Sequence, residues 1–91
     1  MARYDPTIPK ELLIRAERGD KGAQYTLGLY YATEDTSAEC LILAHMWFNI
    51  AAIAGDARAR TERKEMAEMM SAAEIAEAQK RARAQLQAQR G

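Results

Sequence analysis

The chain has 91 residues, enough for one small domain whose core is adequate only if its helices pack closely or a partner covers part of it. Its 13 basic and 13 acidic residues cancel, which excludes a uniform attraction to nucleic acid or to an anionic membrane. A single cysteine excludes an internal disulfide, no apolar run approaches the roughly 20 residues of a membrane span, and the first residues lack a signal-peptide pattern. We therefore expect a cytoplasmic protein without direct membrane insertion.

The first predicted helix follows two prolines. Pro9 suits its first turn, and Leu12, Leu13 and Ala16 recur at helical spacing. Residues 18–20, Arg-Gly-Asp, then end this helix and begin another. Glycine at position 19 can adopt the left-handed conformation that ends a helix, and the aspartate after it can cap the next helix.

The second predicted helix runs from this corner to a polar break at residues 33–37. Small and large apolar side chains alternate on one of its faces: Ala23, Leu27, Gly28 and Tyr31. In the polar break, Thr36 and Glu39 have the spacing of a capping box. This spacing predicts that a third helix begins near residue 38.

The third predicted helix, residues 38–54, is the most apolar part of the chain. One face carries Ala44, Trp47, Ala51 and Ala54, with Phe48 and Ala52 beside it, and the opposite face carries Ile42, Met46, Ile50 and Ile53. A helix that is apolar on both sides should be covered on both sides. Either the flanking helices of this chain provide all of the cover, or part of one face is left for a partner.

A second corner, Gly55-Asp56, has the same pattern as the first: a glycine that can end one helix and an aspartate that can cap the next. Residues 14–23 and 50–59 are identical at five of ten positions, including the Gly-Asp pair of each corner. A helix over residues 57–70 is expected next, followed by a last helix that Ser71 and Glu74 open as a capping box and that continues toward residue 89. No segment shows the alternation of a strand, so the sequence predicts an all-α fold.

Both corners belong to a longer pattern that resembles the Sel1-like repeat, a helical-hairpin family related to the tetratricopeptide repeat. The signature positions, in order and at the expected spacing, are Ala23, Leu27, Gly28, Tyr31, Ala44, Trp47, Ala51, Ala52 and Gly55. The resemblance implies a short right-handed solenoid of α-α hairpins. It divides the single domain, residues 1–91, into a full repeat at about 20–55 and a half-repeat with a C-terminal capping helix at about 56–90.

The match has departures. The loop between the paired helices lacks the usual glycines, and in the second unit Arg63, Lys64 and Ala67 replace the Leu-Gly-x-x-Tyr positions. Members of the family act mainly as adaptors and accessory subunits, and they share no catalytic residues. The resemblance therefore implies a non-catalytic accessory subunit of a larger bacterial assembly. The alternative is a free regulatory adaptor that binds a peptide or effector protein, which would not elute with a host from a sizing column.

Sequence motifs for catalysis or metal binding are not found. His45 and Cys40, five residues apart on a helix, point in different directions, and two ligands are too few for a structural zinc site. The basic residues Arg58, Arg60, Arg63 and Lys64 alternate with glutamates, as is ordinary for a solvated helix face. We therefore expect no enzyme activity, cofactor, metal, small-molecule substrate or nucleic-acid partner.

The surface for the expected protein partner should consist of apolar side chains that the hairpin core does not use. Aromatic residues and methionine are favoured at the centres of protein interfaces. The candidates are Tyr25, Leu29 and Tyr30 on the second predicted helix and Ile42, Met46 and Ile53 on the third.

Overall fold

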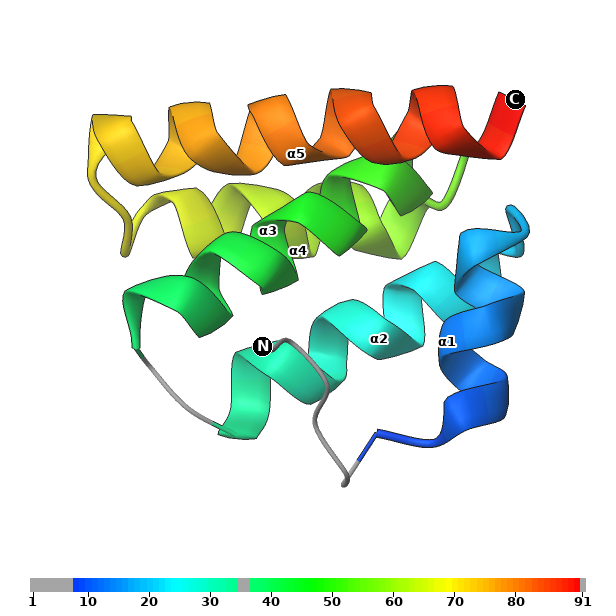
Figure 1. Cartoon of the computed structure of the whole chain (residues 1–91). Helices are drawn as coiled ribbons and strands as arrows, with labels where there is room; N and C mark the ends of the chain where they lie inside the picture. The colour runs from blue at the N-terminus through cyan, green and yellow to red at the C-terminus, as the bar shows by residue number, and fades with distance from the viewer. Residues whose placement is uncertain (1–7, 35–36, 91) are drawn as a thin grey trace.

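The computed structural model describes residues 8–34 and 37–90, which form five helices and no strand (Figure 1). The all-α prediction is confirmed for this part of the chain. The helices are α1 (Lys10–Glu17), α2 (Lys21–Glu34), α3 (Ala38–Ile53), α4 (Ala57–Ala67) and α5 (Ala72–Arg90). None of them is both long enough and apolar enough to cross a membrane.

The two Gly-Asp corners are built alike. Gly19 and Gly55 have φ angles of 102° and 107°, as predicted, which a residue with a Cβ rarely adopts. At each corner the following aspartate caps the next helix, with Oδ1 of Asp20 and of Asp56 accepting a backbone N–H three residues later at 3.1 Å. Each corner thus ends one helix and starts the next by local hydrogen bonds alone.

The remaining helix ends agree in part with the sequence predictions. The hydroxyl of Ser37 caps α3 by accepting the Cys40 N–H at 3.3 Å, whereas Thr36, the predicted cap, lies outside the described residues. Helix α4 ends at Ala67, earlier than predicted, because the next three backbone N–H groups bond to carbonyls three residues back and tighten the chain into a turn. The capping box of Ser71 and Glu74 is confirmed, with reciprocal bonds of 2.9 and 3.1 Å.

Helix α3 lies at the centre of the molecule. Helices α2, α4 and α5 all pack against it, and Figure 1 shows α5 running along the side of α3 that is opposite α2. Residues 41–48 and 50–52 of α3 are buried as a result. The helices of this chain therefore cover most of both apolar faces, and Ile53, at 60 % exposure, marks the end of α3 that they leave open.

The contact between α2 and α3 is close at Gly28. A Cβ at this position would lie 2.5 Å from Cε1 of Phe48, whose ring is fully buried. The Tyr25 ring packs beside Phe48, with ring centroids 5.9 Å apart. The positions that define the repeat pattern are buried in this core except Gly55, which lies at the exposed corner: Ala23, Leu27, Gly28, Tyr31, Ala44, Trp47, Ala51 and Ala52.

Helices α1 and α5 meet at the Ala16 carbonyl. This oxygen accepts one hydrogen bond from Gln24 Nε2 at 3.0 Å and another from Gln89 Nε2 at 3.3 Å. A second contact links α5 to α3: Arg81 forms a bidentate ion pair with Glu39, with N–O distances of 2.7 and 3.1 Å. Helix α5 is thus held to both the first and the central helix.

Candidate functional site

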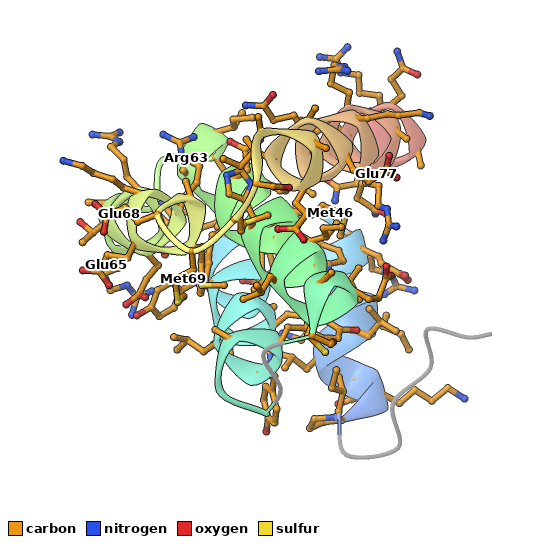
Figure 2. The ribbon with its side chains drawn as sticks, turned by 90° about the vertical axis from the view of Figure 1, so that its left-hand side faces the viewer. Met46, Arg63, Glu65, Glu68, Met69 and Glu77 are labelled. Atoms are coloured by element: carbon orange, nitrogen blue, oxygen red, sulfur yellow. The ribbon has the colours of Figure 1, made fainter. Side chains whose placement is uncertain are left out.

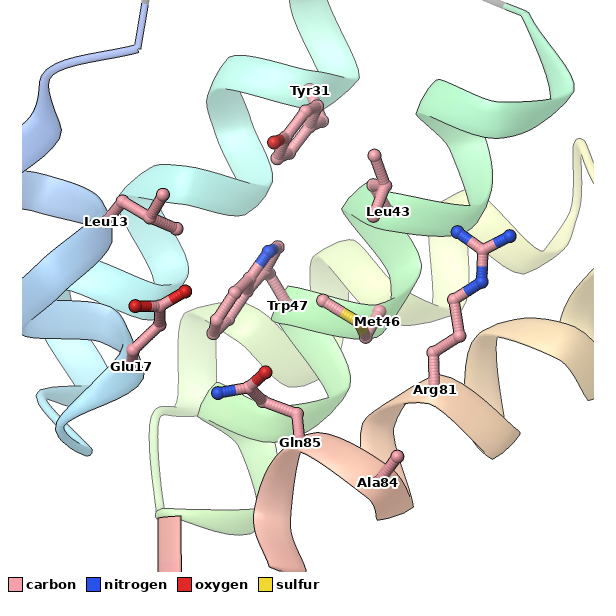
Figure 3. A pocket seen from close by; sticks show the side chains of 9 residues that line it. All are labelled: Leu13, Glu17, Tyr31, Leu43, Met46, Trp47, Arg81, Ala84 and Gln85. Atoms are coloured by element: carbon pink, nitrogen blue, oxygen red, sulfur yellow. The ribbon is translucent and has the colours of Figure 1, made fainter. Parts of the chain in front are cut away.

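A pocket of about 490 Å³ opens between α1, α2, α3 and α5 (Figure 3). It is a candidate site because apolar hollows of this size with a few polar groups at their edge commonly bind ligands or partner side chains. Nine residues line it: Leu13, Glu17, Tyr31, Leu43, Met46, Trp47, Arg81, Ala84 and Gln85.

The floor of the pocket is apolar and comes mainly from α3. Leu43, Met46 and Trp47 recur at spacings of three and four, which places them on one side of that helix. Figure 3 shows Trp47 at the middle of the pocket, between Leu13 of α1 and Met46. Because the Trp47 side chain is only 4 % exposed, it forms part of the floor of the pocket and does not project into solvent.

The rim carries charges of both signs. Glu17 of α1 is exposed on one side, and Arg81 of α5 lies on the other (Figure 3). The Arg81 guanidinium is fixed by Glu39 and by Glu77 Oε2 at 2.9 Å. Glu39 and Glu77 together raise the pKa of Arg81, and the hydrogen bond from Arg81 lowers the pKa of Glu77. The α5 side of the rim is therefore permanently charged and held in place.

The pocket lining combines apolar side chains with a few polar groups. Its lining includes no serine, cysteine, threonine or histidine, and its one guanidinium already engages two carboxylates. What remains is an aromatic and aliphatic floor, an amide from Gln85, and an exposed carboxylate. Such a surface can accept an apolar side chain and orient a positive group beside it.

The six residues predicted to bind a partner lie in different environments. Tyr25, Leu29 and Tyr30 are half-buried on α2, and the Arg58 guanidinium stacks over the Tyr25 ring at 4.1 Å from its centroid. Ile42 and Met46 are buried, at 8 % and 6 % exposure, because α5 covers that side of α3. The structure does not bring the six together: Ile53 is 60 % exposed at the end of α3, and only Met46 lines the pocket.

No motif in the sequence singles out the pocket residues on α1 and α5. Leu13 and Glu17 are four residues apart, and Arg81, Ala84 and Gln85 are three and four apart, so each set shares one helix face. This spacing shows that each set of residues shares one face of its helix. It does not show that the face on α1 and the face on α5 border the same pocket.

His45 and Cys40 also have defined positions. His45 is buried, at 3 % exposure, and Cys40 is a free thiol packed at the edge of the core. Within residues 8–34 and 37–90, no three His, Cys, Asp or Glu side chains are grouped so that they could hold a metal ion.

Comparison of the chain with protein-family models, with curated proteins and with solved structures gives no match.

Proposed function

We propose that this chain is a non-catalytic protein-interaction module that holds an apolar side chain of a larger protein in the pocket between α1 and α5. The observation that carries the proposal is the open apolar floor around Trp47, bordered by charged and amide groups. Interfaces concentrate binding energy where an anchoring side chain fills such a pocket and polar groups surround it.

The charges at the rim suggest the chemistry of the partner segment. Arg81 is already paired with Glu39 and Glu77, whereas Glu17 is exposed. A partner segment that places a lysine or arginine next to its apolar anchor would complement Glu17 without disturbing the pairs on α5. We infer that the anchor is a large aliphatic or aromatic side chain flanked by a basic residue.

The architecture proposed for this module is the Sel1-like hairpin repeat. Two features support it: the similar construction of the Gly19-Asp20 and Gly55-Asp56 corners, and the burial of every signature position except Gly55. In this interpretation α2 and α3 form the full repeat of a right-handed solenoid, α4 begins a half-repeat, and α5 serves as the cap.

The proposed role is that of an accessory subunit in a larger cytoplasmic assembly. Stacking of repeats stabilises solenoids, and a chain with little more than one hairpin has few stacking contacts of its own. Binding a host protein would therefore add stability as well as attach the module.

The experiment is co-purification of the wild-type protein and of two matched variants, in each of which one alanine of α5 is replaced by tryptophan. Tagged wild-type protein is purified from its own cells, and the proteins it retains are identified by mass spectrometry. Ala84 lines the pocket and is exposed, so Ala84→Trp should fill the pocket without removing a core residue. Ala76 is also exposed on α5 but does not line the pocket, so Ala76→Trp is the control.

We expect Ala84→Trp to reduce recovery of the retained protein at least ten-fold and Ala76→Trp to leave it unchanged, with both variants as helical as the wild type by circular dichroism. Glu17→Lys should weaken recovery as well, because it reverses the exposed rim charge. Equal recovery with Ala84→Trp, or a wild-type chain that retains no protein, would contradict the proposal.

A further inference from the structure

A second hollow, of about 380 Å³, lies between α3, α4 and α5 on another part of the surface. Its polar lining consists of His45 and Asn49 from α3, Arg60, Arg63 and Lys64 from α4, and Gln79 from α5. No carboxylate is among the residues that line it. All of these polar groups can donate hydrogen bonds, and three of them carry a full positive charge.

The cations gather here because of their spacing along α4. Arg60, Arg63 and Lys64 are separated by three and four residues, which places them on one side of the helix. Figure 2 shows Arg63 on the side of α4 toward α5, while Glu65 and Glu68 lie on its outer side. Glu65 and Glu68 thus lie away from the side of α4 that carries Arg63 and faces the hollow.

Arg63 is already positioned. Its Nη1 donates to Oδ1 of Asn49 at 2.7 Å, which holds the guanidinium against α3, and among residues 8–34 and 37–90 its other N–H groups have no recorded acceptor. Asn49 and Arg63 are both only half-exposed, so an anion bound there would be partly removed from water. Charge-assisted hydrogen bonds are stronger under those conditions.

His45 supplies an independent observation. The residue is only 3 % exposed, and its Nδ1 is buried without a hydrogen-bond partner in the described structure. Buried polar atoms normally have a partner, so an unpaired nitrogen on a residue that lines a hollow is a feature to be explained. Burial lowers the pKa of His45, and the charge of Arg63 lowers it further, so the imidazole is neutral at pH 7 and has one N–H to donate.

We propose that this hollow binds a phosphate group. Three positive charges around one small space exceed what a single carboxylate would neutralise, whereas a phosphate dianion offers two charges and several acceptor oxygens. Arg63 would provide the planar fork, and Arg60 and Lys64 at the exposed edge would provide the remaining charge. This assignment does not depend on the apolar pocket or on the partner proposed for it.

The same chemistry could come from inorganic phosphate or from a small phosphate monoester. The volume of the hollow exceeds what a phosphate ion fills, which leaves space for a short attached group. Both sources present the same dianion to the α4 cations. The two are distinguished by titrating the protein with each.

The test uses the only histidine of the chain as its reporter. The ring-proton NMR signals of His45 are followed at constant pH and ionic strength while sodium chloride is replaced by inorganic phosphate or by glycerol phosphate. We expect a saturable shift with at least one of them. Binding of glycerol phosphate ten-fold tighter than that of phosphate would identify a monoester site, and equal binding would identify a site for the free ion. Absence of a saturable shift with both would overturn the proposal.

Two variants test the assignment of residues. Arg60→Gln combined with Lys64→Gln changes two exposed side chains and should weaken binding at least ten-fold with the fold intact by circular dichroism. Arg83→Gln removes a positive charge from the exposed surface of α5 outside the hollow and should leave the affinity unchanged. Equal affinity in the double variant, or an equal loss in Arg83→Gln, would overturn the site. Should the double variant not fold, Arg60→Gln alone provides the same comparison.

Discussion

Gly28 determines how closely α2 approaches α3. An added Cβ would lie 2.5, 2.6 and 3.0 Å from three atoms of the Phe48 ring, all inside van der Waals contact. The ring is completely buried, so it cannot move aside without displacing other core residues. The absence of a side chain at position 28 is therefore a packing requirement, since the backbone there is ordinary helix.

We expect Gly28→Ala to lower the free energy of unfolding by about 1–3 kcal/mol, the usual range for overpacking a core. Gly22→Ala is the matched control in the same helix, because a Cβ there would meet only Asp20 Oδ1, at 3.4 Å. Its helix propensity should make it neutral or stabilising by up to about 1 kcal/mol. Urea unfolding of the two variants measures the difference. A Gly28→Ala protein as stable as the wild type would contradict the close approach.

His45 links stability to pH. Because burial and then the Arg63 charge lower its pKa in the folded protein, the unfolded chain binds a proton more readily. Stability is therefore greatest above about 6.5, the ordinary pKa of histidine, and falls as the pH decreases below it. The pKa values of Asp20 and Asp56 are also lowered, through the Ala23 N–H and the Arg58 side chain respectively, but they act in a more acidic range, near pH 4 and below.

We expect the wild-type protein to lose stability between pH 7.5 and 5.5 (roughly the range where histidine begins to titrate), with a slope of at most about 1.4 kcal/mol per pH unit for a single group. His45→Gln should abolish most of this slope. Urea unfolding in phosphate-free buffer at several pH values provides the measurement, and phosphate is avoided because of the site proposed beside His45. A gain of stability on acidification over this range would show the sign to be wrong.

At the scale of whole helices, the sequence predicts where helices begin and end, because interactions between residues close in the chain determine those positions. The Gly19 and Gly55 corners and the Ser71–Glu74 box are set by backbone conformation and by hydrogen bonds within a few residues. The cover that α5 provides for α3 depends on contacts between segments far apart in the chain, and helical periodicity does not contain that information. This is why Ile42 and Met46 could be recognised as apolar but not as buried.

Met46 and Ile53 share one face of α3 but differ in burial, so they should respond differently to a charge. Met46→Asp would bury a carboxylate without a partner, and we expect it to unfold the domain or to cost at least about 3 kcal/mol. Ile53→Asp is the control at the exposed end of the same helix and should cost at most about 1 kcal/mol. Thermal unfolding followed by circular dichroism distinguishes them. A Met46→Asp protein that melts like the wild type would place that residue on the surface.

At the scale of the whole molecule, both pockets are products of tertiary packing. The apolar pocket uses side chains from α1, α2, α3 and α5, and the basic hollow uses α3, α4 and α5. The sequence did show that α4 carries many cations, and it indicated a solvated face. It did not show that α3 and α5 form walls on either side of those cations, which changes an ordinary charged surface into a partly enclosed one.

The Ala16 carbonyl, which accepts hydrogen bonds from both Gln24 and Gln89, has a consequence for the order in which the molecule assembles. The two residues in the second bond are separated by 73 positions, nearly the full described length of the chain. Closing so long a loop is entropically unfavourable until the intervening helices have docked, so we expect this contact to form late in folding. We expect the last turns of α1 and of α5 to open together, as one cooperative unit, and not to fray independently.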